Sequence, residues 1–310
     1  MKNESRNIGF LISTVAFGLV ALTAIPLRVY QYFHVIEPGT GFFISTDATV
    51  YALYGLLGAG LICSMASALI CRREIGYDRS VKKRPGQGIF AVLACVSMFY
   101  EVGVIVGRLM GDIEDPGDGT FLITVLLLRA QVIFGLLAAV YILLVGIGCF
   151  TGKSNGSEFK ILSAAPMAWL MFRLILCFTT KISFTKVSEL TLELFMLAFM
   201  LMFFGAYAQL NSKIESKGLD WKVVGYGLPA AVFGLCCFVP RLVMVLTGNE
   251  SGLYENGPVT FCDLGLALYI LSVVFTRVGW VGGNADAKEE NVAAEAVPAA
   301  ETEEIKEEAE

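Results

Sequence analysis

Eight long apolar runs constrain what this chain can fold into more than any other feature. They cover, approximately, residues 8–31, 48–70, 88–111, 121–150, 159–180, 188–210, 223–247 and 258–281. Most hold roughly 20 residues or more, and a helix rising about 1.5 Å per residue then crosses a hydrocarbon core about 30 Å thick. Backbone groups in lipid must be satisfied within the protein, and the alternation of a membrane barrel is absent. The runs therefore predict an all-α integral membrane protein with eight transmembrane helices in residues 1–282.

The composition also indicates a lipid environment. The chain is 56% hydrophobic and 16% charged, whereas soluble domains are about 45–50% apolar and about 25% charged. The net charge of −5 originates in residues 283–310, which hold ten acids and two lysines and predict a disordered acidic tail. The first 27 residues resemble a signal peptide. We expect them to remain as the first span, because Arg28 belongs to the repeat described below.

Lysine and arginine are distributed unequally between the two sets of connections. Thirteen lie in the N-terminal segment and in the connections after the second, fourth and sixth runs, with six in residues 71–88 alone. The opposite connections hold two, Lys181 and Lys186. Basic connections stay in the cytoplasm, so the asymmetry predicts a multi-pass protein of the cell membrane with both termini cytoplasmic.

An arginine followed by Leu or Val recurs near the outer end of every odd-numbered run. The four arginines are 80, 65 and 68 residues apart, a spacing of one helical hairpin with its connection: Arg28, Arg108, Arg173 and Arg241. The second helices of three hairpins begin with acids: Asp47, Glu189 with Glu193, and Asp263. The pattern predicts an ancestral two-helix unit, so that the eight helices form four pseudo-repeated hairpins.

Two charges lie deeper than the repeated arginines. Glu101 is about 15 Å from the outer end of the third predicted helix, and Arg129 is about 12 Å into the fourth. An arginine near a helix centre costs at least about 2.5–3.5 kcal/mol in a bilayer, so we expect Glu101 and Arg129 to pair inside the bundle. The same depth argument gives three further pairs: Arg173 with Glu193, Arg241 with Asp263, and Arg28 with Asp47.

These charges have two interpretations. In the structural one, ion pairs align the hairpins, while Arg28 and Arg108 reach the headgroup phosphates. In the functional one, the charges line an outward-facing vestibule that binds a small polar or anionic solute. The functional interpretation predicts a transporter or permease-like protein and is our leading hypothesis. The structural one predicts a sensor, an accessory subunit or a scaffold, and in both cases the lipid bilayer is the main partner.

The sequence lacks the motifs of common catalytic and cofactor sites. Its one histidine, His34, excludes a histidine-based triad, a bis-histidine haem and an HExxH zinc site. There is no GxSxG or P-loop, and the eight cysteines have no metal-ligand spacing. We therefore expect no catalytic residue, metal, cofactor, enzymatic activity or nucleic-acid partner. The GxxxG motif of Gly103 and Gly107 is expected to pack against another helix of the chain.

Overall fold

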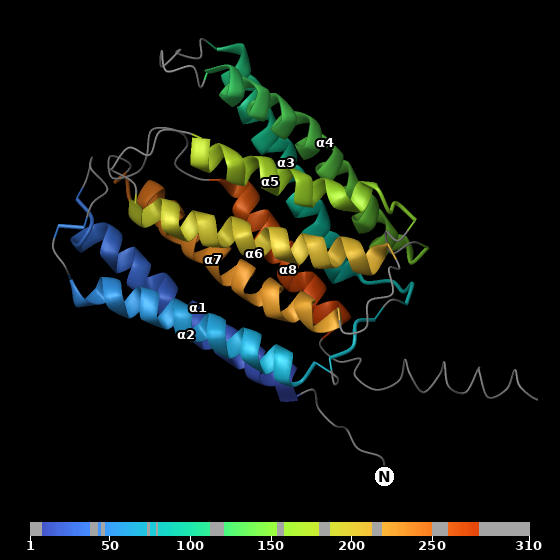
Figure 1. Cartoon of the computed structure of the whole chain (residues 1–310), viewed down its shortest axis with the longest axis horizontal. Helices are drawn as coiled ribbons and strands as arrows, with labels where there is room; N and C mark the ends of the chain where they lie inside the picture. The colour runs from blue at the N-terminus through green and yellow to red at the C-terminus, as the bar shows by residue number, and fades with distance from the viewer. Residues whose placement is uncertain are drawn as a thin grey trace, which may run out of the picture.

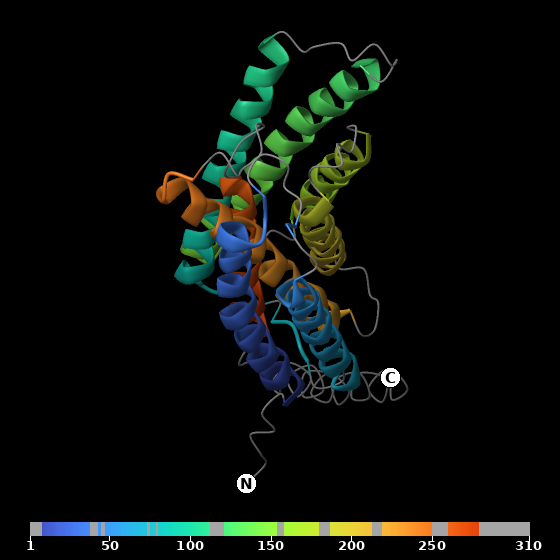
Figure 2. The same cartoon turned by 90° about the vertical axis from the view of Figure 1, so that its left-hand side faces the viewer.

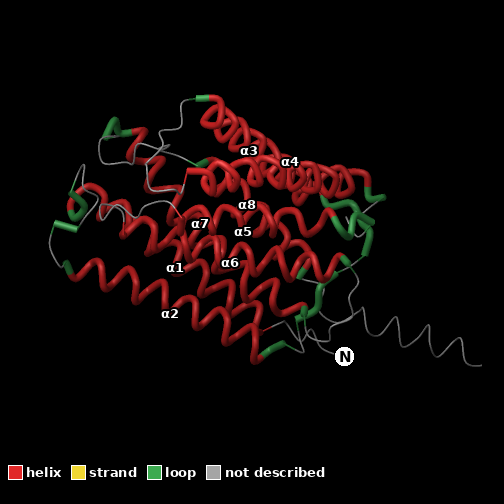
Figure 3. Tube along the Cα trace, turned by 45° about the horizontal axis from the view of Figure 1, so that its top comes forward, coloured by secondary structure: helices red, strands yellow, loops and turns green. Residues whose placement is uncertain are grey.

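The chain is mainly helical in the part that the computed structural model describes: residues 8–37, 43–44, 47–72, 75–78, 80–111, 121–153, 158–179, 187–212, 219–249 and 260–278. No strand occurs among these residues (Figure 3). The helices are α1 (Ile8–His34), α2 (Ala48–Ile70), α3 (Pro85–Met110), α4 (Phe121–Thr151), α5 (Ala165–Thr179), α6 (Val187–Asn211), α7 (Asp220–Leu246) and α8 (Phe261–Arg277). The all-helical fold class is confirmed, and the predicted tail at 283–310 lies outside the described residues.

Seven helices, α1 to α7, are long and apolar enough to cross a membrane; the α5 segment includes a 3-10 turn, η1 (Leu162–Ala164), that precedes it. The eighth helix, α8, has 17 residues, which correspond to about 25 Å of helix. Large apolar side chains cover the outside of the bundle: Leu22, Ile62 and Leu122 are exposed by 74%, 69% and 75%. Lipid is the solvent that tolerates such a surface, so the chain has the architecture of a multi-pass membrane protein.

Helix α7 lies at the centre of the bundle and packs against α1, α2, α6 and α8 (Figure 1). Its sequence explains the position, because small residues allow neighbouring helices to approach closely. A Cβ atom added at Gly227 would lie 2.9 Å from Val274 of α8, and one at Gly234 would lie 3.0 Å from Ala267. Sixteen of the 27 residues of α7 are buried, as expected for a helix enclosed by others.

The hairpin repeat is not confirmed by the packing. Each consecutive pair, α1 with α2, α3 with α4, α5 with α6, and α7 with α8, is in contact. The pairs have different surroundings, however: α8 also packs on α3, and both α1 and α2 pack on α7. In two views α3 and α4 lean away from the α1–α2 pair (Figures 1 and 2). The eight helices therefore do not form four equivalent hairpins.

Consecutive helices run antiparallel, so all odd-numbered helices finish at the same end of the bundle (Figure 1). The two ends of the bundle therefore carry different residues. We call them the His34 end, where α1 finishes, and the Asp78 end, where the connection from α2 to α3 lies. Every arginine of the sequence repeat is near the His34 end, in the last turns of α1, α3, α5 or α7. The candidate functional site is built there.

Candidate functional site

Arg173 on α5 holds two carboxylates from two other helices. Its Nη1 donates to Asp263 Oδ1 of α8 at 2.5 Å, and its Nη2 donates to Asp263 Oδ2 at 3.1 Å. The same Nη2 also donates to Glu193 Oε1 of α6 at 3.0 Å. Arg173 and Asp263 are 8% and 1% exposed, so this is a buried, charge-assisted connection between α5, α6 and α8.

Arg241 on α7 continues the connection toward α1. Its Nη2 lies 3.6 Å from Glu189 and 3.8 Å from Glu193, which are one turn apart on α6. The Tyr32 hydroxyl of α1 donates a hydrogen bond to Glu189. The guanidinium of Arg28 lies 4.9 Å from the centre of the Tyr32 ring, a distance suited to a cation–π contact. A continuous polar chain, which we call the charged chain, thus joins α1, α6, α7, α5 and α8.

Glu101 of α3 lies at the far end of the charged chain. Its side chain is partly buried, and within the described residues it has no ion pair or hydrogen bond. Arg173 and Asp263 are the charges that act on it most strongly, and exposed Arg108 acts on it from the end of α3. Glu101 therefore adds a sixth helix to the site through electrostatics and not through direct contact.

The predicted pairing is right for one pair, Arg173 with Glu193. It is wrong for Arg241 with Asp263, because Asp263 pairs with Arg173 and Arg241 pairs with the two glutamates of α6. Depth along the bundle can be read from the sequence, but rotation about each helix axis cannot. The rotation decides which of several charges at one depth meet.

Two further pairs are also wrong. Arg129 is exposed on α4, and among the described residues it forms no ion pair with Glu101 or any other acid. Arg28 is 1% exposed and its Nη1 donates to Gln31 Oε1 at 3.0 Å. Asp47 instead caps α2, where its Oδ1 accepts from the backbone N–H of Thr49 at 3.0 Å.

Tyr32 is a member of the charged chain that the sequence argument missed. It follows Arg28 by four residues and therefore lies on the same helix face. A tyrosine one turn from a buried arginine, near the end of a membrane helix, was the available signal. A tyrosine at such a position is usually an interfacial aromatic anchor, and this interpretation gave no reason to expect the hydrogen bond to Glu189.

The charge balance of the site decides what it can bind. The ion-paired core contains three carboxylates, Glu189, Glu193 and Asp263, but two guanidinium groups, those of Arg173 and Arg241. Arg28 and Glu101 add one charge of each sign at the two ends, and Arg108 is left out of this balance because its side chain is exposed. Without the exposed Arg108, one carboxylate remains in excess, and a largely buried site with this balance is suited to uptake of a proton.

No protein-family model, curated protein or solved structure matches the chain. Among the described residues, no group of three or more His, Cys, Asp and Glu side chains is arranged to hold a metal ion.

Proposed function

We propose that the chain is a membrane transport protein for a small polar solute, and that the charged chain binds the proton that is coupled to transport. The excess of one carboxylate over the buried arginines carries this proposal. An unpaired negative charge is costly in a low-dielectric interior, so the site gains stability by taking up a positive charge. An anionic solute, which the repeated arginines favoured at the level of sequence, fits this balance poorly.

Glu101 is the carboxylate at which the positive charge binds. Glu193 and Asp263 each accept hydrogen bonds from Arg173, whereas Glu101 has no direct partner in the described part of the chain. When Glu101 is neutral, the Arg173 guanidinium interacts with Asp263 and Glu193 alone. When Glu101 is ionised, its negative charge also attracts that guanidinium and weakens the two other interactions. Loss or gain of one proton then changes how strongly Arg173 ties α5 to α6 and α8.

Helix α7 supplies a place where such a change can be converted into movement. Pro240 lies inside α7 directly before Arg241, and a proline removes one backbone hydrogen bond and bends the helix. Interrupted helices that expose backbone groups next to the substrate are a recurrent feature of transporters. Arg241 is therefore a charged group on a helix segment with a weakened backbone, which fits a coupling role.

The orientation follows from the basic connections. The Asp78 end carries the Lys- and Arg-rich segment 71–88, and the positive-inside rule supports a cytoplasmic location for it. The charged chain then lies in the outer half of the cell membrane, and both termini are cytoplasmic. Enzymatic activity forms no part of this proposal.

The test is proton flux in vesicles. The full-length protein is reconstituted into liposomes that contain a pH-sensitive dye, and a panel of small cationic, zwitterionic, neutral and anionic solutes is added outside. We expect one of the first three classes to produce a solute-dependent pH change. Glu101→Gln should abolish that change, because the amide cannot exchange a proton, and should remove a protonated-carboxyl band from infrared spectra of the protein.

Arg129→Gln is the matched control, since Arg129 is a charged residue of the same half of the bundle that is exposed and forms no ion pair within the described residues. It should leave flux unchanged. The proposal is refuted if no solute in the panel moves protons, or if Glu101→Gln transports as well as the parent. Absence of flux together with co-purification of a partner membrane protein would support the accessory-subunit alternative instead.

A further inference from the structure

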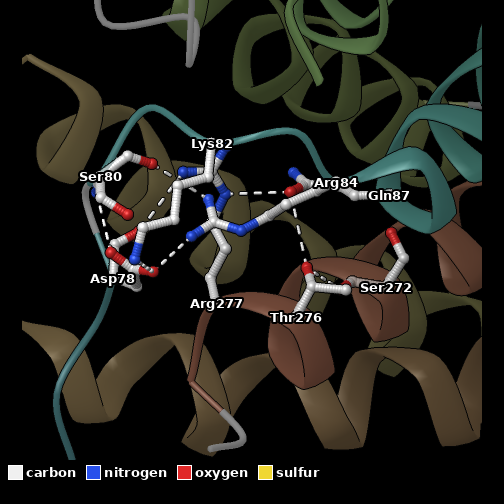
Figure 4. Close-up of polar contacts among 8 residues, drawn as sticks. All are labelled: Asp78, Ser80, Lys82, Arg84, Gln87, Ser272, Thr276 and Arg277. Atoms are coloured by element: carbon white, nitrogen blue, oxygen red, sulfur yellow. Dashed lines mark hydrogen bonds and ion pairs between the residues drawn. The ribbon is translucent and has the colours of Figure 1, made fainter. Parts of the chain in front are cut away.

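Another buried arginine lies at the Asp78 end, far from the charged chain. Arg277, the last residue of α8, is 1% exposed. Its Nε donates to Gln87 Oε1 of α3 at 3.0 Å, and its Nη1 donates to the backbone carbonyl of Asp78 at 3.4 Å (Figure 4). Its guanidinium also lies 5.6 Å from the centre of the Tyr77 ring. All of these contacts are with neutral groups.

Arg277 has no carboxylate partner among the described residues, although Asp78 is next to it. The Asp78 carboxylate faces Arg84 at 2.5 Å and Lys82 at 3.9 Å, and offers Arg277 only its backbone (Figure 4). The other polar groups around Arg277 are the hydroxyls of Tyr207 and Tyr269 and the Cys149 thiol. A guanidinium cannot lose its proton in a protein, and a buried charge without a counter-charge is strongly unfavourable.

Two hydrogen-bond donors beside Arg277 also lack acceptors. The Tyr77 hydroxyl and Gln87 Nε2 are buried and have no hydrogen-bond partner in the described structure. Tyr77 is 7% exposed and Gln87 is 0% exposed. The Gln87 amide orientation is fixed, because its oxygen accepts from Arg277 and from Thr276, and the reversed amide would direct N–H groups at a guanidinium.

These observations combine into a site for a negative ion. Within the described residues, no carboxylate contacts the Arg277 guanidinium, the Tyr77 hydroxyl or Gln87 Nε2. The Asp78 carboxylate faces Arg84, and the Asp220 carboxylate accepts from the backbone N–H of Tyr77 at 3.3 Å. A water molecule can satisfy the donors but leaves the charge of Arg277 uncompensated. We propose that a single small inorganic anion of the halide class, such as chloride, binds between Arg277, Tyr77 and Gln87. Larger anions and lipid headgroups are excluded by the burial of all three side chains.

The anion holds the connection between α2 and α3 against the end of α8. Tyr77 and Asp78 belong to that connection, and the backbone N–H of Asp78 donates to the carbonyl of Arg277 at 2.8 Å. An anion that contacts Tyr77 and Arg277 adds a second link between the same two segments. Chloride should therefore stabilise the folded protein in a saturable way.

The test is anion-dependent stability of the full-length protein in detergent. Thermal unfolding is followed at constant ionic strength while sodium gluconate is replaced by sodium chloride, and chloride binding is measured directly by equilibrium dialysis with radioactive chloride. We expect a saturable rise in Tm with about one chloride bound, and bromide should replace chloride. Tyr77→Phe should weaken chloride binding by about tenfold, because it removes one donor to the ion and leaves the ring in place.

Two further variants distinguish the buried site from general charge screening. Arg277→Gln should abolish chloride binding, and if it fails to fold, Tyr77→Phe still decides the question. Lys82→Gln is the matched control, because Lys82 is a cation of the same connection with a 67% exposed side chain. The proposal is overturned by equal stability in chloride and gluconate, by an unchanged response in Tyr77→Phe, or by loss of the response in Lys82→Gln.

Discussion

Replacement of Arg173 by methionine tests whether the charged chain holds the bundle together. Methionine has a similar length and no charge, so the change removes the guanidinium but retains apolar volume. It leaves Asp263, which is 1% exposed, and Glu193 without their shared donor. Removal of one partner from a buried ion pair costs about 3–5 kcal/mol. Because Arg173 makes three hydrogen bonds to two carboxylates, we expect Arg173→Met to lower the free energy of unfolding by that amount.

A double-mutant cycle with Asp263→Asn separates the pair from the general effect of the substitution. Asp263→Asn alone should cost about 1.5–3 kcal/mol, because a charge-assisted hydrogen bond is replaced while Arg173 keeps Glu193. The double variant should be less destabilised than the sum, by about 0.5–3 kcal/mol, since a neutral Asn needs no counter-ion once Arg173 is absent.

The assay is reversible unfolding of the full-length protein in mixed micelles, followed by tryptophan fluorescence. Trp169 is a suitable reporter because the Arg173 guanidinium lies 5.8 Å from its ring centre. Arg129→Met, at an exposed position, is the control and should change stability by about 0.5 kcal/mol or less. Equal effects of Arg173→Met and Arg129→Met, or strict additivity in the cycle, would refute the view that these ion pairs are structurally coupled.

Three other predictions concern pH, packing and topology. Burial opposes ionisation of Asp78, but the hydrogen bonds and the arginine at its carboxylate hold its pKa below the ordinary value. The parent should therefore be more stable than Asp78→Asn above pH about 4 and lose this advantage as the pH falls further, in paired thermal scans. Gly265→Ala should destabilise by about 1–3 kcal/mol because its Cβ overlaps α3, whereas Gly103→Ala, in open space, should stabilise by about 0.5–1 kcal/mol; chemical unfolding measures both. Single cysteines at His34 and Lys82 in a cysteine-free background should react with an impermeant maleimide from opposite sides of the membrane, and labelling from one side would contradict the antiparallel bundle.

The helical membrane class could be predicted from the sequence because it depends on one-dimensional quantities. Run length, apolar content and the absence of alternation each have a direct physical link to helices in lipid. The gathering of charges at one end was predictable for the same reason, since the rise per residue converts sequence position into depth. Arg173 and Glu193 were matched in this way, and they do meet.

Features that depend on helix rotation or on partner helices were not predictable. The GxxxG motif of Gly103 and Gly107 was expected to pack within the chain, but a Cβ added at either glycine meets no atom within 4 Å. The close approach of α3 to α8 occurs instead at Gly265, which no motif marks. Arg277 was overlooked because a basic residue at the predicted cytoplasmic end of a span has an ordinary explanation in the positive-inside rule. The Asp78 connection, which buries it, cannot be foreseen from local sequence.

Helix α8 links the two networks, and its own stability explains why its ends carry these charges. An acid in the first turn and a base in the last turn both complement the helix macrodipole, and α8 has Asp263 and Arg277 at these positions. The two residues are 14 apart, which places the networks about 21 Å from each other along the helix. The side chains that stabilise α8 as a helix are therefore the same ones that fasten it to Arg173 at one end and to Gln87 at the other. A charge that enters either network therefore acts on one end of α8, and between the two ends the Tyr269 hydroxyl of α8 donates to the Tyr207 hydroxyl of α6 at 3.1 Å.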